Sequence, residues 1–263
     1  MLIPFLLSVT LGRAAIAQSP EDMVTLEVLP GWRTEQGTQM AGLRLTLAPG
    51  WKTYWRAPGD AGIPPAFNWR GSQNIDAAEF HWPVPEVFQL NGMQSIGYTG
   101  QVVIPIELTP TVVGQPARIA GEIEIGVCEE ICVPVHLSFD APLTDTTHRD
   151  LAIATALVDR PLTATEADVG RVLCATAPSD NGLSVTAQVQ IPVTGAPEVV
   201  VIEAGDPRVW VSEAETSRDG DWLTARVQMI PVSGGAFSLD RSAVRITVLG
   251  SDKAVDIRGC TAG

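Results

Sequence analysis

The stretch that decides the fold is RIAGEIEIGVCEEICVPVHLSF, residues 118–139, which holds two of the four cysteines. Apolar residues recur at every second position in the run that ends at Val127, and again from Val133 to Phe139. Successive side chains of a strand point to opposite faces, so each run predicts a strand with one buried face. Cys128 and Cys132 fall at the alternate positions, on the polar side of each strand (the polar parity), so the pattern predicts that both sulfurs point away from the core.

The spacing of these two cysteines constrains the chain between them. On one straight strand, residues four apart lie roughly 13 Å from each other, about twice the Cα separation that a disulfide allows. The chain must therefore turn within residues 129–131 if the pair is to close. A ring of this size stabilises by only about 2 kcal/mol in the chain-entropy model, so the bond would be a weak staple.

Short alternating runs, separated by Gly- and Pro-rich turns, extend in both directions from this stretch. They occupy residues 24–28, 43–47 and 102–108 before it, and residues 183–191, 199–201, 223–229 and 244–248 after it. This texture is typical of antiparallel β-sandwiches. The sequence predicts an all-β protein with one sandwich over residues 18–142 and a second over residues 169–263.

In residues 143–168 the apolar residues are instead spaced with the period of a helix, and this segment is predicted to be a short helical linker. Thr146 or Thr147 is a candidate N-cap for this helix, and Pro161 would end it. Residues 1–17 resemble a secretory signal, because an apolar run leads to the small residues Ala15-Ile16-Ala17. No later apolar run is long enough to span a bilayer. We therefore expect an exported protein in which disulfides can form.

The chain is acidic, with 30 Asp and Glu against 17 Lys and Arg and a net charge of −13. A surface of this sign repels phosphate backbones and anionic lipids. Nucleic acids and anionic membranes are therefore excluded as expected partners.

Three interpretations of Cys128 and Cys132 are open from the residues alone. The pair can be a structural disulfide that closes a hairpin. It can bind Cu(I) or Zn(II) together with His136, which has the same parity, because thiolate and imidazole suit these metals. It can also exchange electrons through a mixed disulfide. Two neighbouring glutamates, residues 129 and 130, disfavour a thiolate and so suit exchange with docked partners.

The other two cysteines, Cys174 and Cys260, stand near the first and last strands of the second predicted sandwich. A disulfide between them would close a ring of about 87 residues, worth roughly 4.6 kcal/mol in the same model. We predict a structural staple. Cys260 follows the polar parity of its strand, and a bulge at Gly259 would correct this.

Five of the seven tryptophans precede residue 83, and the segment from Gly50 to Gly59 is the richest in aromatic residues. A sugar-binding sandwich would show such rings on one exposed face. The alternative, which we favour, is that Trp51, Trp69 and Trp82 fill the core between the sheets. In either case Tyr54 or Trp55 is expected beside the cysteine pair.

Several landmarks resemble a known family. They are Trp82-Pro83, the segment from Phe88 to Gly92, Ile96-Gly97-Tyr98, Ile104-Pro105-Ile106, and the cysteine segment from Gly126 to Pro134. Together they resemble the amino-terminal domain of DsbD-type thiol:disulfide interchange proteins. The segment from Gly50 to Asp60 is similar to the ScsB-like branch. The likeness covers residues 21–142 and is weaker in the second domain.

The resemblance implies immunoglobulin-like sandwiches and a redox-active Cys128–Cys132 pair. It also implies a loop with an aromatic side chain that shields the disulfide from stray reductants. The matching segment is residues 86–92, with Phe88 or Leu90 as the covering side chain and Glu86 as the remaining acidic residue. Tyr54 and Tyr98 are the expected flanking residues.

We therefore expect a periplasmic protein that relays electrons from a membrane-embedded thiol reductase, or a thioredoxin-like domain acting in trans, to exported thiol proteins. If it is an enzyme, it is a protein-disulfide reductase, and no cofactor is expected. The alternative from another class is a copper- or glycan-binding periplasmic module with a purely structural disulfide.

Overall fold

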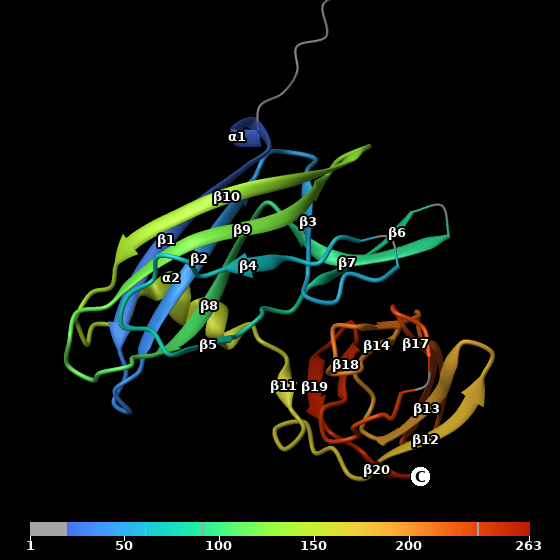
Figure 1. The fold of residues 1–263 in the computed structure, drawn as a ribbon. Helices are drawn as coiled ribbons and strands as arrows, with labels where there is room; N and C mark the ends of the chain where they lie inside the picture. The colour runs from blue at the N-terminus through green and yellow to red at the C-terminus, as the bar shows by residue number, and fades with distance from the viewer. Residues whose placement is uncertain (1–19, 61, 91, 236) are drawn as a thin grey trace, which may run out of the picture.

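The structure is a computed structural model that describes residues 20–60, 62–90, 92–235 and 237–263. The expected leader, residues 1–17, lies outside the described residues. Antiparallel strands form two β-sandwiches, one from each half of the chain, with a short helix between them in sequence (Figure 1). This confirms the predicted all-β class of two immunoglobulin-like sandwiches joined by a helical linker.

The first sandwich consists of two sheets and is preceded by a single helical turn, α1 (Pro20–Met23). One sheet has the order β1-β2-β8-β5, formed by β1 (Val24–Arg33), β2 (Gln39–Leu47), β8 (Gln101–Thr109) and β5 (Ala77–Phe80). The other has the order β10-β9-β3-β7-β6, formed by β10 (Cys132–Pro142), β9 (Arg118–Cys128), β3 (Lys52–Tyr54), β7 (Met93–Thr99) and β6 (Glu86–Leu90), with β4 (Ala66–Asn68) also paired to β9.

The core of the first sandwich follows the alternation of β9. Ile123, Ile125 and Val127 are buried, whereas Glu122 and Glu124 on the opposite face are exposed. The tryptophans join the same interior: Trp51, Trp55 and Trp82 are buried, and Trp69 is half-buried. The aromatic residues therefore pack the core, as we favoured, and these rings do not form an exposed sugar-binding face.

The second sandwich also has two sheets. One has the order β11-β19-β18-β14, formed by β11 (Leu162–Thr163), β19 (Ala254–Arg258), β18 (Arg245–Leu249) and β14 (Val199–Glu203). The other has the order β15-β17-β13-β12-β20, formed by β15 (Val209–Val211), β17 (Trp222–Pro231), β13 (Gly182–Gln190), β12 (Val172–Ser179) and β20 (Thr261–Ala262), with β16 (Glu215–Asp219) also paired to β17.

The linker helix α2 (Leu151–Val158) begins later than its predicted caps. Its N-cap is Asp150, whose carboxylate accepts hydrogen bonds from the backbone N–H groups of Ala152 and Ile153. Neither Thr146 nor Thr147 caps it, because Asp150 lies directly at the helix start and its carboxylate carries a full negative charge there. Ile153 is fully buried in a cluster with β1 and β2 residues, so the helix packs on the first sandwich.

The two sandwiches contact each other through Arg56 and a shared apolar cluster. The Arg56 guanidinium lies 3.8 Å from the centre of the Trp55 ring and donates hydrogen bonds to Glu203 Oε2, at 2.9 Å, and Thr247 Oγ1, at 3.0 Å. Leu249 and Ala254 of the second sandwich pack into the core cluster of the first. A buried cation held by both domains joins them across this contact. No described helix is long and apolar enough to span a membrane.

Candidate functional site

The hairpin β9–β10 brings the two central cysteines together. Its register places Cys132 directly opposite Cys128, and their Cα atoms are 4.1 Å apart. The sulfurs are joined as a disulfide. Residues 129–131 form the turn that the spacing required, and all three are exposed; the Ile131 side chain is 76% exposed. The pair therefore sits at the turn of the hairpin, beside an apolar side chain in solvent.

The two sulfurs, which we predicted to point away from the core, differ in exposure. Cys132 is exposed. Cys128 has the polar parity of β9 and is absent from the packed core clusters, yet only 1% of it is exposed. The reason is that another side chain of the same sheet face, Tyr54, covers it. Parity identifies the face on which a side chain lies, but it does not show what lies on that face.

Tyr54 on β3 contacts both sulfurs. Its hydroxyl lies 2.8 Å from Cys128 Sγ and 3.1 Å from Cys132 Sγ. Burial raises the pKa of this phenol above its ordinary value, so the hydroxyl keeps its proton at neutral pH. A protonated hydroxyl can donate to a sulfur, and it does so more strongly to a thiolate than to a disulfide. Tyr54 is thus placed to stabilise the charge that appears when the bond opens.

The Tyr54 ring can pack over residue 126 because that residue is glycine. A Cβ at this position would lie 2.8 Å from Cβ of Ile63 and 2.9 Å from Cδ2 of Tyr54, closer than packed carbons approach. The Thr53 hydroxyl donates to the Gly126 carbonyl, at 2.9 Å, and so fixes β3 against β9. The tyrosine ring and the loop before β4 therefore lie flat on this part of the sheet.

The predicted cap segment lies on the far side of β3 from the cysteines. Phe88 pairs with Ser95 across β6 and β7, and its ring centre is 4.9 Å from Nζ of Lys52, whose Cα pairs with that of Cys128. The Glu86 carboxylate accepts a hydrogen bond from Thr99 Oγ1 at 2.7 Å. The side chain of Leu90 is outside the described part of the chain. Shielding of the disulfide by Phe88 or Leu90 stays a prediction.

Tyr98, the other flanking candidate, faces away from the sulfurs. It is 5% exposed, packs in the core with Trp82, and donates its hydroxyl to the Pro83 carbonyl at 2.8 Å. Burial holds the pKa of Tyr98 well above its ordinary value. The structure therefore assigns the two tyrosines to opposite faces of one sheet, with only Tyr54 on the cysteine side.

The alternative metal ligands are not brought together. His136 is four residues along β10 from Cys132, roughly 13 Å on an extended strand, and its Nδ1 lies 3.9 Å from a Glu124 carboxylate oxygen. Among the described residues, no three His, Cys, Asp or Glu side chains form a cluster that could hold a metal ion. The geometry favours a disulfide over a three-ligand site.

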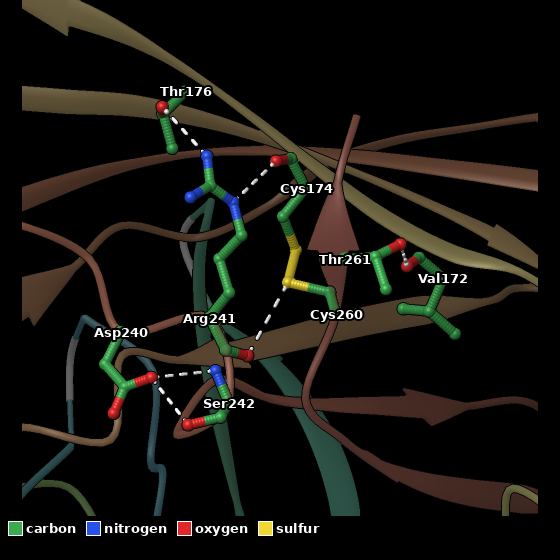
Figure 2. Close-up of a disulfide and its surroundings, with 8 residues drawn as sticks. All are labelled: Val172, Cys174, Thr176, Asp240, Arg241, Ser242, Cys260 and Thr261. Carbon is green, nitrogen blue, oxygen red and sulfur yellow. Dashed lines mark hydrogen bonds between the residues drawn. A yellow bond between two sulfur atoms is a disulfide. The ribbon is translucent and has the colours of Figure 1, made fainter.

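The second disulfide lies inside the second sandwich (Figure 2). It joins Cys174, which is fully buried on β12, to Cys260, between β19 and β20, with Cα atoms 5.8 Å apart. Arg241 packs beside it and donates to the Cys174 carbonyl at 3.1 Å. Gly259 has a φ of +77°, so the strand breaks before Cys260, where we had expected a bulge.

Sequence reasoning gave Tyr54 only as a neighbour, and it missed Ile63 and Gly126. Gly126 carried a usable signal, because a glycine inside an otherwise apolar strand marks a close approach of other atoms. Ile63 carried none, since it lies in a Pro- and Gly-rich loop whose path depends on the whole sandwich.

The chain is similar to known proteins in its first domain and in its fold. Residues 21–143 match the family model of the N-terminal domain of the thiol:disulfide interchange protein DsbD. The fold is similar to a crystal structure of the N-terminal periplasmic domain of ScsB from Proteus mirabilis, with a TM-score of 0.71 and 22% identity over 94% of this chain and 97% of that chain.

A crystal structure of the Neisseria meningitidis DsbD N-terminal domain in the reduced form gives a TM-score of 0.32 and 18% identity, over 51% of this chain and 95% of that chain. No match was found among curated proteins. Residues 21–143 thus match the N-terminal domain family of the thiol:disulfide interchange protein DsbD, and the chain has a fold similar to that of the N-terminal periplasmic domain of ScsB.

Proposed function

We propose that the protein relays electrons in the periplasm through its Cys128–Cys132 pair. The donor is a membrane-embedded thiol reductase, or a thioredoxin-like domain acting in trans, and the acceptors are exported proteins with oxidised thiols. The observation that carries this proposal is the asymmetry of the disulfide. One sulfur, on Cys132, is exposed, whereas the other is buried under a hydroxyl that contacts both.

The asymmetry supports an order of attack. A donor thiolate approaches Cys132 Sγ, forms a mixed disulfide with it, and breaks the Cys128–Cys132 bond. The electron pair of that bond leaves on Cys128, where the Tyr54 hydroxyl can donate to the thiolate. The second donor thiol then attacks the donor sulfur of the mixed disulfide and releases Cys132. The donor leaves oxidised, and two protons from solvent complete the Cys128–Cys132 dithiol.

Reduction of an acceptor runs through the same steps in reverse. The Cys132 thiolate attacks the acceptor disulfide, and Cys128 resolves the mixed disulfide that results. Exposed Ile131 beside Cys132 offers an apolar contact for a docked partner. The neighbouring carboxylates Glu129 and Glu130 disfavour reaction with anionic thiols that do not dock.

A matched pair of variants tests the order of attack. In Cys128→Ser the exposed Cys132 thiol remains, so we expect rapid reaction with Ellman's reagent and accumulation of mixed disulfides with exported proteins. In Cys132→Ser only the covered Cys128 remains, so we expect much slower reaction. Equal rates in the two variants, or faster reaction of Cys132→Ser, would contradict the proposal.

Redox titration separates the relay from the alternative of a copper- or glycan-binding module. Equilibration of the wild-type chain with glutathione or thioredoxin is expected to give a potential in the range of exchange proteins, about −200 to −270 mV. A potential well below about −300 mV would identify an inert structural disulfide.

A further inference from the structure

A cleft of about 660 Å³ lies between the two sandwiches. Its wall on the first domain is the loop that follows β3, with Pro58 and Pro64, together with Gln94 and Ile96 of β7. Its wall on the second domain consists of residues 200–207 and 209–214, with Val232 at the margin. In Figure 1, β14 lies on the side of the second domain that faces β7. This volume is enough for a short peptide segment.

Strand β14 forms part of the second-domain wall. Its residues 200–203, and Ala204 directly after them, line the cleft. Val200 and Ile202 belong to the core of the second sandwich, whereas Val201 lies on the opposite face and packs toward the first domain. Residues from both faces of a strand can line one cleft only if the cleft runs along the edge of that strand. β14 is the last strand of its sheet, and within the described residues it pairs with β18 alone. Its outward backbone N–H and C=O groups therefore face the cleft.

This edge lacks the devices that usually protect an edge strand. Natural sheets place Lys, Pro or a bulge at such positions. β14 reads VVVIE, and its register with β18 is regular throughout. An apolar edge with high β-propensity, inside a cleft, suits the addition of one more strand from another polypeptide.

The charges of the cleft indicate the chemistry of that polypeptide. Among the described residues that line it, four are acidic and one, Arg56, is basic. Glu203 offsets the Arg56 charge at 2.9 Å, and Asp206 is paired with Arg208 at 2.8 Å. Asp60 and Glu213 remain as the acidic residues that line the cleft without an ion pair among the described residues. Trp210 lines the same cleft and is 43% exposed, as an anchor for an apolar side chain would be.

We infer that the β14 edge is a docking site for an extended segment of a partner polypeptide, with alternating apolar side chains and at least one Lys or Arg. The segment pairs with β14 as an added strand and places a side chain against Trp210. This goes beyond the exchange reaction and requires neither central cysteine. The loop that walls the cleft also covers Tyr54, since a Cβ at Gly62 would lie 2.9 Å from Cδ1 of Tyr54. A docked segment is thus separated from the disulfide by one loop.

The test is selection of phage-displayed random heptapeptides on the full chain, followed by calorimetry with a synthetic consensus peptide. We expect the consensus to alternate apolar residues and to contain Lys or Arg. Trp210→Ala should weaken binding about tenfold, and Asp60→Asn with Glu213→Gln should weaken it several-fold and reduce its salt dependence. Val193→Ala is the matched control, because this residue is 60% exposed in the second domain and does not line the cleft.

Backbone N-methylation of alternate peptide residues distinguishes strand addition from apolar contact alone. One of the two methylation registers should abolish binding while the side chains are unchanged. Binding should persist in the Cys128→Ser and Cys132→Ser variants, so failure of this proposal and failure of the relay are separable. The inference is overturned if no peptide is selected, or if binding is insensitive to Trp210→Ala or to both methylation registers. It is also overturned if the cleft instead mediates self-association, seen as sedimentation of a dimer that Trp210→Ala dissociates.

Discussion

The two disulfides of this chain are the same bond in opposite settings. Cys128–Cys132 joins residues four apart at the turn of a hairpin, with one cysteine exposed. Cys174–Cys260 joins residues 86 apart, with Cys174 fully buried in the core of the second sandwich. In the chain-entropy model the short ring contributes about 2 kcal/mol and the long ring about 4.6 kcal/mol. The first has an exposed cysteine and contributes little stability, and the second has one fully buried and one half-buried cysteine and contributes much.

The difference teaches how one molecule separates chemistry from stability. A bond that opens in each cycle must not hold the fold, and a bond that holds the fold must be kept from thiols. Here the first domain has a large apolar core and its hairpin has eleven paired positions, from Cys132↔Cys128 to Pro142↔Arg118. Reduction therefore leaves β9 and β10 paired along their length, whereas loss of the second bond frees the end of the chain.

The largest expected effect is on stability. Replacing both Cys174 and Cys260 by Ala should lower the free energy of unfolding by about 4 to 5 kcal/mol, because the 86-residue separation is no longer closed in the unfolded chain. Replacing both Cys128 and Cys132 by Ala should lower it by only about 2 kcal/mol. Denaturant unfolding under non-reducing conditions measures both. Equal losses in the two double variants would remove the contrast on which the assignment of roles depends.

The second effect is selectivity in reduction. With a limiting amount of dithiothreitol, Cys128–Cys132 should open about two orders of magnitude faster than Cys174–Cys260, because exchange requires access to a sulfur. Trapping with a heavy and a light alkylating reagent, followed by mass spectrometry of the two cysteine peptides, gives both rates. If the buried pair opened first, Cys174–Cys260 would be the exchange site and the comparison would be reversed.

The third prediction concerns the pH dependence of the free energy of unfolding, through Glu198 in the second domain. Burial by itself raises the pKa of Glu198, but hydrogen bonds from Arg218 and Thr194 outweigh it and hold that pKa at about 2. A carboxylate whose pKa is lowered on folding stabilises above its unfolded value, and this contribution is lost as the pH falls toward 2. Discounted for solvent screening, it is about 2 kcal/mol at pH 7.

Glu198→Gln should therefore cost stability at pH 7 and cost progressively less between about pH 4.5 and pH 2. Unfolding at a series of pH values measures this. Glu215→Gln, on the exposed strand β16, serves as the matched control and should show no such convergence. A cost that stayed constant as the pH fell would show that Glu198 acts by packing rather than by charge.

Much of the fold was predictable because strand alternation is a local property. The runs at 43–47, 102–108 and 223–229 lie within strands of the structure, and the run at 183–191 passes the end of β13 by one residue. The short strands β3 to β7 gave no comparable signal, since they have only three to seven residues, too few for a clear alternation. The helix start was placed too early because an Asp directly before the apolar run is a better cap than the earlier threonines.

The site was predictable to the level of the cysteine pair and its sheet face. What alternation could not give was the side chain on that face that covers one of the two sulfurs. Tyr54 reaches Cys128 across 74 residues of sequence because β3 pairs with β9, and this register depends on both sheets. The exposure of a residue with polar parity is decided by such tertiary neighbours, which no local pattern contains.

The smallest effect, and the one that tests the site most directly, is removal of the Tyr54 hydroxyl. In Tyr54→Phe a thiolate on Cys128 loses a hydrogen bond, while the disulfide loses only a weak one. The pKa of the Cys128 thiol in the Cys132→Ser background should therefore rise. The reduction potential of the pair should fall by less than about 30 mV, the shift that corresponds to a tenfold change in the equilibrium constant.

Tyr98→Phe is the control, because it also removes a buried hydroxyl, one that donates to Pro83 on the far face of the sheet. If both variants shifted the potential equally, the effect would come from loss of packing and the hydroxyl would have no role at the sulfurs. A shift confined to Tyr54→Phe would show that the exposed end of the hairpin is tuned for opening, which nothing at the buried Cys174–Cys260 bond requires.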